Sequence, residues 1–307
     1  MRQKKKVILL AGPTASGKSK LAIKLAKHFR GEIINADSMQ VYKEISILTS
    51  KPKKKDMKIA KHHLYGFIPV KKKFSTGRWL ELVLKKIEEQ WEKGQTPIIV
   101  GGTGLYFKAL TDGLVKIPEI PTKKRIQVRK LHKKIGQKKF FNELIKLDPL
   151  AKSLVLPSDS QRSMRAYEVK KFTKKSLFDF LKETKSNFNN KTFKKIFLNT
   201  PRELLHKKIA TRVDKMFSDG VINEVEKFYK MKVNKELSSN KIIGIKEIGD
   251  YLQNKTKLIE TKELITIKTR QYAKRQFTWA RGHMKSWEMI YSSNINDLYK
   301  KALNKIS

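Results

Sequence analysis

A glycine-rich loop follows directly after an apolar run at residues 7–10. It matches the pattern G-x-x-x-x-G-K-[ST] at every fixed position, and its residues are Gly12, Pro13, Thr14, Ala15, Ser16, Gly17, Lys18 and Ser19. In such a loop, backbone N–H groups turn inward around phosphate oxygens, the lysine adds a positive charge and the serine hydroxyl can bind Mg²⁺. A strand-like run before the loop and a helix-like run after it favour this interpretation over a chance glycine-rich turn. The sequence therefore predicts a phosphate-binding α/β domain, with Ser19 as the protein's ligand to Mg²⁺.

Further apolar runs predict that the loop belongs to a parallel sheet flanked by helices. Residues 32–35, 97–100 and 196–198 have the composition of buried strands, and residues 79–92 have apolar side chains at helical spacing. From about residue 116 the strand pattern stops and a basic, helix-rich stretch follows. We predict an α/β fold of the P-loop NTPase kind, formed by residues 1–118 and 194–307, with an inserted all-helical domain at 119–193. The short apolar runs 242–245 and 289–291 fit either a strand or a helix.

The composition of the chain is strongly basic. It has 70 lysine and arginine residues against 28 aspartate and glutamate residues, a formal net charge of +42. This excess favours a polyanionic partner such as nucleic acid, although lysine spread over a whole chain is also typical of a biased genome composition. The absence of cysteine excludes disulfides and thiolate metal sites. Because the uncharged runs are too short to span a bilayer, we expect no membrane contact and a cytoplasmic protein.

Polar residues follow two of the predicted strands, at the sheet edge where open α/β folds bind ligands. Asp37 comes after the strand at 32–35, and Thr103 lies in a second glycine-rich turn, at 101–106. A carboxylate at this edge can act as a general base toward a group bound over the phosphate loop, and the threonine can bond a substrate amine. Two alternatives stay open: Asp37 can cap a turn or a helix, and Thr103 can cap its own helix.

Two basic segments are candidates for contact with nucleic acid. Arg162 and Arg165 lie three residues apart after a capping sequence at 158–161, so they share one face of a helix. Residues 269–281 interleave cations with aromatic side chains, a pattern that suits an RNA backbone and its bases. A structural alternative stays open for each segment. The arginines can form salt bridges on a solvated surface, and the aromatic side chains can belong to the core.

Taken together, segments from nearly the whole chain resemble the bacterial tRNA dimethylallyltransferases, also called tRNA isopentenyltransferases. The matching segments are 12–19, 37–42, 62–64, 101–106, 148–149, 161–166, 212–216, 244–247 and 269–279. The sequences Asp-Ser-Met-Gln-Val-Tyr, Gly-Gly-Thr-Gly-Leu-Tyr and Arg-Gln-Tyr-Ala-Lys-Arg-Gln are more specific than the phosphate loop alone. The resemblance implies a monomeric, Mg²⁺-dependent enzyme. It would transfer a dimethylallyl group from dimethylallyl diphosphate to N6 of the adenosine immediately 3′ of the tRNA anticodon.

The resemblance also implies roles for individual residues. Lys18 and Arg212 would stabilise the departing diphosphate, Asp37 would accept the proton of the amine, and Thr103 would orient that amine. The inserted domain would hold the anticodon stem-loop. The residues expected to bind tRNA are Asp37, Ser38, Met39, Gln40, Thr103, Arg125, Gln161, Arg162, Ser163, Met164, Arg165, Lys246, Arg270 and Lys274.

Three places depart from the family pattern: residues 44–49, Ile245 where a tyrosine is usual, and Ala280 where an aromatic residue is often found. After the Val-Tyr pair the family usually has Gly-x-Asp-Ile-Gly-Thr, whereas this chain has Glu44-Ile45-Ser46-Ile47-Leu48-Thr49. Both glycines and the aspartate are lost, so the family pattern does not predict the geometry of this loop beside Asp37.

Three other functions are compatible with parts of the sequence. The phosphate loop alone would suit a small-molecule P-loop kinase, although the basic insertion argues against one. An isopentenyltransferase acting on free adenine nucleotide would share the loop but would not need the insertion. A non-catalytic P-loop protein that binds RNA would need no general base.

Overall fold

The computed structural model describes residues 5–306 of the chain, which divides into two compact units. The core unit comprises the described residues up to Thr111 and those from Phe188 onward. The insertion unit comprises Asp112–Asn187. These limits differ by a few residues from the predicted insertion at 119–193. At its C-terminal end the difference arises because Phe193 already pairs with Val7 in the sheet.

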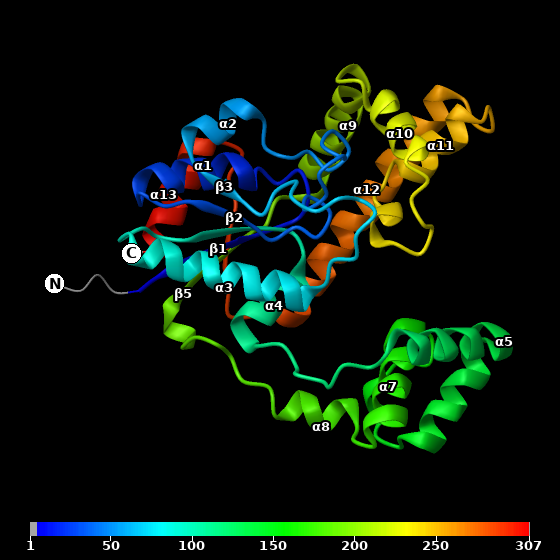
Figure 1. The fold of residues 1–307 in the computed structure, drawn as a ribbon. Coiled ribbons are helices and arrows are strands. Elements are labelled where there is room, and N and C mark those ends of the chain that lie inside the picture. Colours follow the sequence, from blue (N-terminus) through cyan, green and yellow to red (C-terminus); the bar gives the residue numbers. More distant parts are fainter. Residues whose placement is uncertain (1–4, 307) are drawn as a thin grey trace. The chain divides into compact units, whose positions relative to one another are not determined.

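A six-stranded parallel sheet forms the centre of the core unit (Figure 1). Its strands, in spatial order, are β3 (His62–His63), β2 (Ile33–Asn35), β4 (Ile98–Gly101), β1 (Val7–Ala11), β5 (Phe193–Leu198) and β6 (Glu288–Ile290). The register sets Leu9 of β1 opposite Ile99 of β4 and Lys195 of β5. Every residue of β1 is buried, as expected for the centre of a parallel sheet. The carboxyl ends of β1, β2 and β4 therefore meet at one edge.

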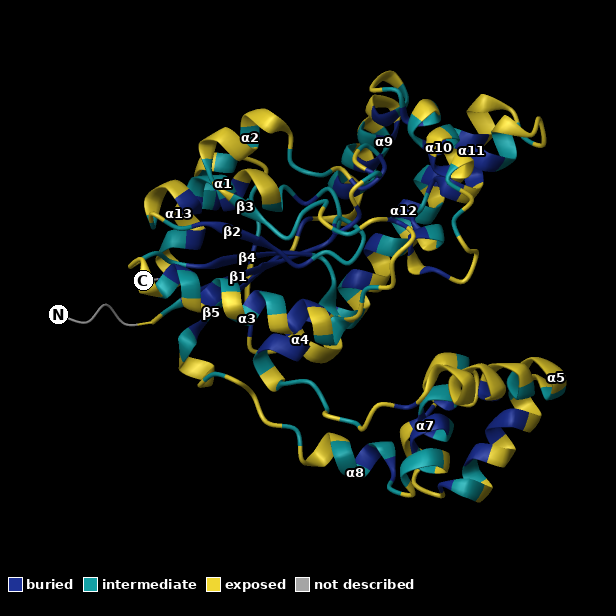
Figure 2. Cartoon of the chain, in the orientation of Figure 1, coloured by how far each residue is buried: buried dark blue, intermediate teal, exposed yellow. Residues whose placement is uncertain are grey.

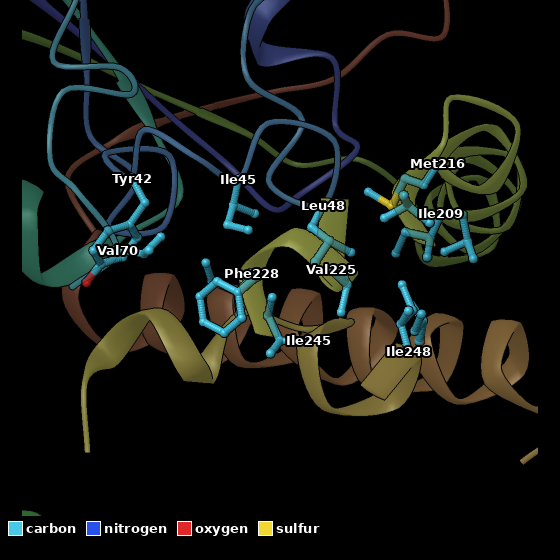
Figure 3. Packing of buried hydrophobic residues seen from close by; sticks show 14 of the residues in the cluster. Tyr42, Ile45, Leu48, Val70, Ile209, Met216, Val225, Phe228, Ile245 and Ile248 are labelled. Carbon is cyan, nitrogen blue, oxygen red and sulfur yellow. The ribbon is translucent and has the colours of Figure 1, made fainter. Parts of the chain in front are cut away.

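Helices cover the sheet and build a second core beyond its edge. The helices that begin in the core unit are α1 (Lys18–His28), α2 (Lys54–Ile59), α3 (Thr76–Glu92), α4 (Gly104–Asp112), α9 (Arg202–Ser218), α10 (Val221–Lys230), α11 (Ile245–Leu252), α12 (Leu258–His283) and α13 (Ile295–Ile306), with 3₁₀ turns η1 (Asn190–Thr192) and η2 (Ser238–Lys241). Leu25 of α1 and Ala302 of α13 are buried with the strands in one cluster. Helices α9 to α12 bury side chains such as Phe228 and Ile248 against the loop after β2 (Figure 3).

The insertion unit contains only helices. They are α5 (Thr122–Leu147), α6 (Ala151–Leu154), α7 (Ser160–Thr173) and α8 (Leu177–Lys182). Gly136 has φ 75° and breaks α5 into two segments. The unit has its own small core, which includes Leu144, Ala151, Ala166 and Phe178. Exposed positions run along most of α5 (Figure 2), so this unit offers a large polar surface.

The predicted fold class is confirmed, since the core unit is a parallel sheet flanked by helices and its sequence is interrupted by a helical insertion. The predicted strands at 32–35, 97–100 and 196–198 and the helix at 79–92 are all present to within a few residues. Of the two ambiguous runs, 289–291 overlaps β6, whereas 242–245 leads from η2 into α11. The sequence does not predict β3, because two residues are too few to form a pattern. No helix in residues 5–306 is long and apolar enough to cross a membrane.

Candidate active site

The phosphate loop joins β1 to the first turn of α1. Gly17 precedes the helix in the left-handed conformation (φ 93°), which glycine adopts without strain. The Lys18 Nζ folds back over the loop and donates hydrogen bonds to the Pro13 carbonyl oxygen at 2.6 Å and the Ser16 hydroxyl at 3.5 Å. Ser19 is exposed in the first turn of α1. A helix N-terminus, a lysine and a hydroxyl thus face one space, which is the arrangement that binds phosphate.

A cavity of about 1560 Å³ opens over this loop. Its walls include Asp37 from the end of β2, Arg212 from α9, and Tyr272 and Gln276 from α12. Of the residues predicted to act on the diphosphate and on the amine, Lys18, Asp37 and Arg212 therefore line this cavity, although they come from three separate parts of the chain.

A second, smaller cavity of about 300 Å³ lies at the ends of β1 and β4. It is lined by Ser38 and Thr103 and by apolar side chains that include Phe197, Trp279 and Met284. The residues that line both cavities are Met39, Tyr272, Arg275 and Gln276. The cavities therefore adjoin: Asp37 faces the phosphate side and Thr103 faces the apolar side.

The larger cavity has a surplus of buried positive charge. Burial lowers the pKa of Lys18 to about 8; the Asp37 carboxylate opposes this shift, and the Arg212 guanidinium adds to it. Burial also lowers the pKa of Arg212, against the attraction of Asp37. Because two cations share one carboxylate away from water, the cavity favours an additional anion.

Arg212 is fixed against the phosphate loop although it lies far from it in the sequence. Its Nη1 donates a hydrogen bond to the Thr14 hydroxyl, and its Nη2 donates one to the Leu48 carbonyl oxygen at 3.3 Å. Its Nε is buried and has no hydrogen-bond partner within residues 5–306. The guanidinium is therefore oriented on two sides and keeps one buried donor, as expected of a group that binds an anion.

Asp37 both shapes a turn and faces the cavity. Its N–H donates to the Asn35 Oδ1 at 2.8 Å, and its Oδ1 accepts the Met39 N–H at 2.9 Å. One carboxylate oxygen, Oδ1, therefore caps a turn, as the alternative role of Asp37 predicted. In the described residues the other oxygen accepts no hydrogen bond from the protein. The two roles are compatible, because each uses a different oxygen.

Thr103 ties the end of β4 to the end of β2. Its hydroxyl oxygen accepts the Ser38 N–H at 2.9 Å, and the hydroxyl lies 3.3 Å from the Ser38 Oγ as a donor. Burial raises the pKa of Tyr272, and the nearby Thr103 side chain opposes that shift. The hydroxyl thus lies among polar groups at the junction of the two cavities.

Gln276 is a site residue that the sequence does not reveal. Its Oε1 accepts the Thr14 N–H at 2.9 Å and its Nε2 donates to the Gly102 carbonyl oxygen at 2.9 Å. A Cβ at position 102 would lie 2.1 Å from the Gln276 Nε2, so this close approach requires glycine. One side chain therefore links the phosphate loop to the turn that carries Thr103. The signals in the sequence are its place as the last residue of the motif Arg-Gln-Tyr-Ala-Lys-Arg-Gln and its helical spacing from Tyr272.

The remaining residues predicted to bind tRNA in the core unit are dispersed. Gln40 donates from its Nε2 to the Thr49 carbonyl oxygen at 2.8 Å and so supports the loop beside the larger cavity. Arg270 is half-buried in α12, with a buried Nε that has no partner in the described part of the chain. Lys274 is exposed on the same helix, and Lys246 is exposed on α11, 3.9 Å from Asp250.

The predicted residues of the insertion unit lie at the start of α7, apart from Arg125, which lies in α5. Arg165 and Arg125 both approach the buried Glu168, at 3.3 Å and 3.5 Å, and Arg162 lies 3.6 Å from Asp159. The salt-bridge alternative therefore describes these arginines as they stand, although the more exposed pair of Arg162 with Asp159 is expected to be weak. The other members of the set are Gln161, which is exposed, Met164, which is half-buried, and Ser163, which is buried and donates to the Asp159 carbonyl oxygen at 2.7 Å.

Comparison with known proteins identifies the family. A family model described as IPP transferase matches residues 40–283. The chain belongs to the IPP transferase family. The IPP transferase prediction made from the sequence is thereby confirmed. The matched range includes Thr103 and Arg212, whereas the phosphate loop and Asp37 precede it.

Individual IPP transferases match the chain over almost its full length. The tRNA dimethylallyltransferase of Pelagibacter ubique is 55% identical over 307 residues, a match that covers 100% of this chain and 98% of that protein. The tRNA dimethylallyltransferase of Rickettsia bellii (strain OSU 85-389) is 46% identical over 299 residues, covering 96% of this chain and 94% of that protein.

Solved structures of IPP transferases share the fold. The tRNA isopentenylpyrophosphate transferase of Bacillus halodurans superposes with a TM-score of 0.70 at 30% identity, covering 99% of this chain and 97% of that chain. A eukaryotic dimethylallyltransferase acting on tRNA superposes with a TM-score of 0.83 at 29% identity. That match covers 98% of this chain and 77% of that chain.

Proposed function

We propose that this IPP transferase moves a dimethylallyl group from dimethylallyl diphosphate to N6 of the adenosine immediately 3′ of the anticodon in tRNA. The observation that carries the proposal is the meeting of a phosphate loop, two buried cations and one carboxylate in a single cavity. Its relatives of similar length are named tRNA dimethylallyltransferases, which favours this reaction over phosphoryl transfer by a small-molecule kinase.

The electrophilic half of the reaction depends on the leaving group. As the bond between C1 of the allylic donor and the diphosphate oxygen breaks, negative charge builds up on the diphosphate. The N–H groups of the phosphate loop, the Lys18 ammonium and the Arg212 guanidinium would bind that charge. The Arg212 Nε, which is buried without a protein partner in the described chain, is the donor best placed to be satisfied by it.

Mg²⁺ fits the residues around the loop. The Ser19 hydroxyl is exposed in the first turn of α1, where the phosphates would lie. Within residues 5–306, no group of three or more His, Cys, Asp or Glu side chains could hold a metal ion. Mg²⁺ in comparable sites is bound by one or two protein oxygens, by substrate phosphates and by water. We expect Ser19 to hold the ion, which would neutralise part of the charge on the diphosphate.

The nucleophilic half depends on Asp37 and Thr103. The lone pair of the adenine N6 amine is delocalised into the ring, so attack on C1 is helped when a base accepts a proton from the nitrogen. The Asp37 carboxylate would accept that proton as the C1–N6 bond forms, and the Thr103 hydroxyl would orient the amine. The adjoining cavities offer one side for the diphosphate and another for the base.

The target base is stacked in the anticodon loop and must be extruded before it can enter. Ser38, Met39 and Gln40 would lie beside the extruded base. Arg270 and Lys274 of α12 would bind the RNA backbone, together with Lys246 and the residues at the start of α7 in the insertion unit. That the enzyme is a monomer and that it is cytoplasmic both stay predictions.

The pKa of Lys18 predicts how donor binding depends on pH. Below pH 8 the ammonium is charged and binds the diphosphate, whereas above pH 8 the free protein loses that charge. If only the charged form binds, the affinity for inorganic diphosphate falls about tenfold between pH 7 and pH 9. Calorimetric titration at both values checks this. The Lys18→Arg variant keeps its charge, so an equal fall in that variant would contradict the assignment.

The proposed reaction is tested by following the prenyl group. The protein is incubated with Mg²⁺, radiolabelled dimethylallyl diphosphate and either total tRNA or AMP. We expect label on tRNA alone. Label on AMP would instead identify an enzyme for free adenine nucleotide, and no transfer to either, with ATP turnover present, would identify a kinase.

A further inference from the structure

The loop from Glu44 to Thr49, which departs from the family pattern, forms a wall of the larger cavity. Ser46, Ile47, Leu48 and Thr49 all line it. Two apolar side chains anchor the loop: Ile45 and Leu48 are buried in the cluster formed by α9 to α12, and Figure 3 shows them pointing toward α10 and α11. The backbone of this loop is therefore part of the proposed donor site.

A single carboxylate holds that backbone. The Glu224 Oε2 accepts the Ser46 N–H at 2.6 Å and the Ile47 N–H at 2.8 Å. The Oε1 accepts the Ile47 N–H at 3.1 Å and the Leu48 N–H at 3.0 Å. Three successive N–H groups thus converge on the two oxygens of Glu224, which lies in the first turn of α10.

Only a carboxylate satisfies this arrangement. Bonds from neutral N–H groups to a charged acceptor are stronger than bonds to a neutral one, and both oxygens accept. A glutamine of the same length would offer one acceptor oxygen and would turn an NH₂ donor toward N–H donors. An aspartate would be one methylene too short to reach from α10.

The loop is hydrogen-bonded in turn to Arg212, one of the groups proposed to bind the diphosphate. Leu48 donates its N–H to the Glu224 carboxylate, and its carbonyl oxygen accepts a hydrogen bond from Arg212 Nη2 at 3.3 Å. The same guanidinium donates to the Thr14 hydroxyl in the phosphate loop. A path of hydrogen bonds therefore runs from Glu224 through Leu48 and Arg212 to Thr14.

We propose that Glu224 is a positioning residue for the donor site, which holds the 46–48 backbone so that Arg212 is aimed at the diphosphate. The expected effect of Glu224 on catalysis rests on the proposed function. Its consequence for diphosphate binding needs only the geometry described above.

The first test compares Glu224→Gln with Glu226→Gln. Glu226 lies on the same helix and its carboxylate pairs with Lys230 at 2.9 Å on the surface, so the control removes the same charge from α10 without touching the loop. The affinity for inorganic diphosphate is measured by calorimetry, together with the thermal unfolding midpoint. We expect about tenfold weaker binding in Glu224→Gln and less than a twofold change in Glu226→Gln. Equal affinities in the two variants would overturn the proposal.

A double-mutant cycle separates positioning from a general loss of stability. In an Arg212→Ala background the group that Glu224 positions is gone, so Glu224→Gln should weaken diphosphate binding less than twofold further. If the fold-changes in diphosphate affinity caused by the two substitutions multiply, Glu224 acts on the fold as a whole and the proposal is overturned. Because these measurements use neither tRNA nor a prenyl donor, they stand whether or not the wild type transfers label to tRNA.

Discussion

Replacing Asp37 with asparagine should lower kcat for prenyl transfer by about 10²–10⁴-fold and leave the affinity for tRNA nearly unchanged. Asparagine has the shape of aspartate, and its Oδ1 can still accept the Met39 N–H that the carboxylate accepts at 2.9 Å. The turn therefore survives, and only the base is lost. Single-turnover transfer with saturating tRNA measures the step directly.

The alternative role of Asp37 makes a different prediction for the same variant. If the carboxylate only caps the turn, Asp37→Asn should behave like the wild type, whereas Asp37→Ala should lose the turn and part of its stability. A loss confined to tRNA affinity in Asp37→Asn would also contradict the assignment as a base. Because the asparagine changes the charge near Lys18, diphosphate affinity is measured alongside as a control.

Replacing Arg212 with alanine should lower kcat/KM for dimethylallyl diphosphate by about 10²–10³-fold. The guanidinium bonds to Thr14 and Leu48 through two nitrogens and keeps a buried Nε for the anion, and alanine removes all of these contacts. Lysine should rescue little, since one ammonium cannot reproduce the planar fork. Initial rates over a range of donor concentrations give the value.

The matched control for Arg212 is Arg202, an exposed arginine at the start of the same helix, which does not line either cavity. Arg202→Ala should change kcat/KM for the donor less than twofold. Full recovery of activity in Arg212→Lys would mean that charge alone suffices at this position and that the fork geometry described above is not used.

Much of the fold follows from local sequence. The strands β1, β2 and β4 are buried throughout, so each is a mostly apolar run that stands out in a lysine-rich chain. In β5 only residues 196–198 form such a run, because Lys194 and Lys195 precede them. The phosphate loop is formed by consecutive residues, so its conformation can be predicted from that short stretch of sequence alone. The two-residue strand β3 is different, because it exists only by pairing with β2 and leaves no periodicity of its own.

The site is harder to predict from the sequence, because several of its contacts join residues that are far apart in the chain. Gln276 bonds to Thr14 across 262 residues, and Glu224 bonds to Ser46 across 178. Glu224 belongs to no motif, and although Gln276 ends the motif Arg-Gln-Tyr-Ala-Lys-Arg-Gln, local spacing does not show that its side chain reaches the phosphate loop. Asp37 and Thr103 could be predicted because both follow strands that end at the same edge of the sheet.

We propose that this cavity prenylates one adenosine of tRNA, and mapping the modified nucleotide in the product distinguishes this reaction from the alternatives. A tRNA transcript with adenosine 3′ of the anticodon is incubated with dimethylallyl diphosphate, digested and analysed by mass spectrometry, beside a transcript with guanosine at that position. We predict a dimethylallyl group on N6 of that adenosine in the first transcript and no modification of the second. Modification of the guanosine transcript, or of another nucleotide in either, would contradict the account.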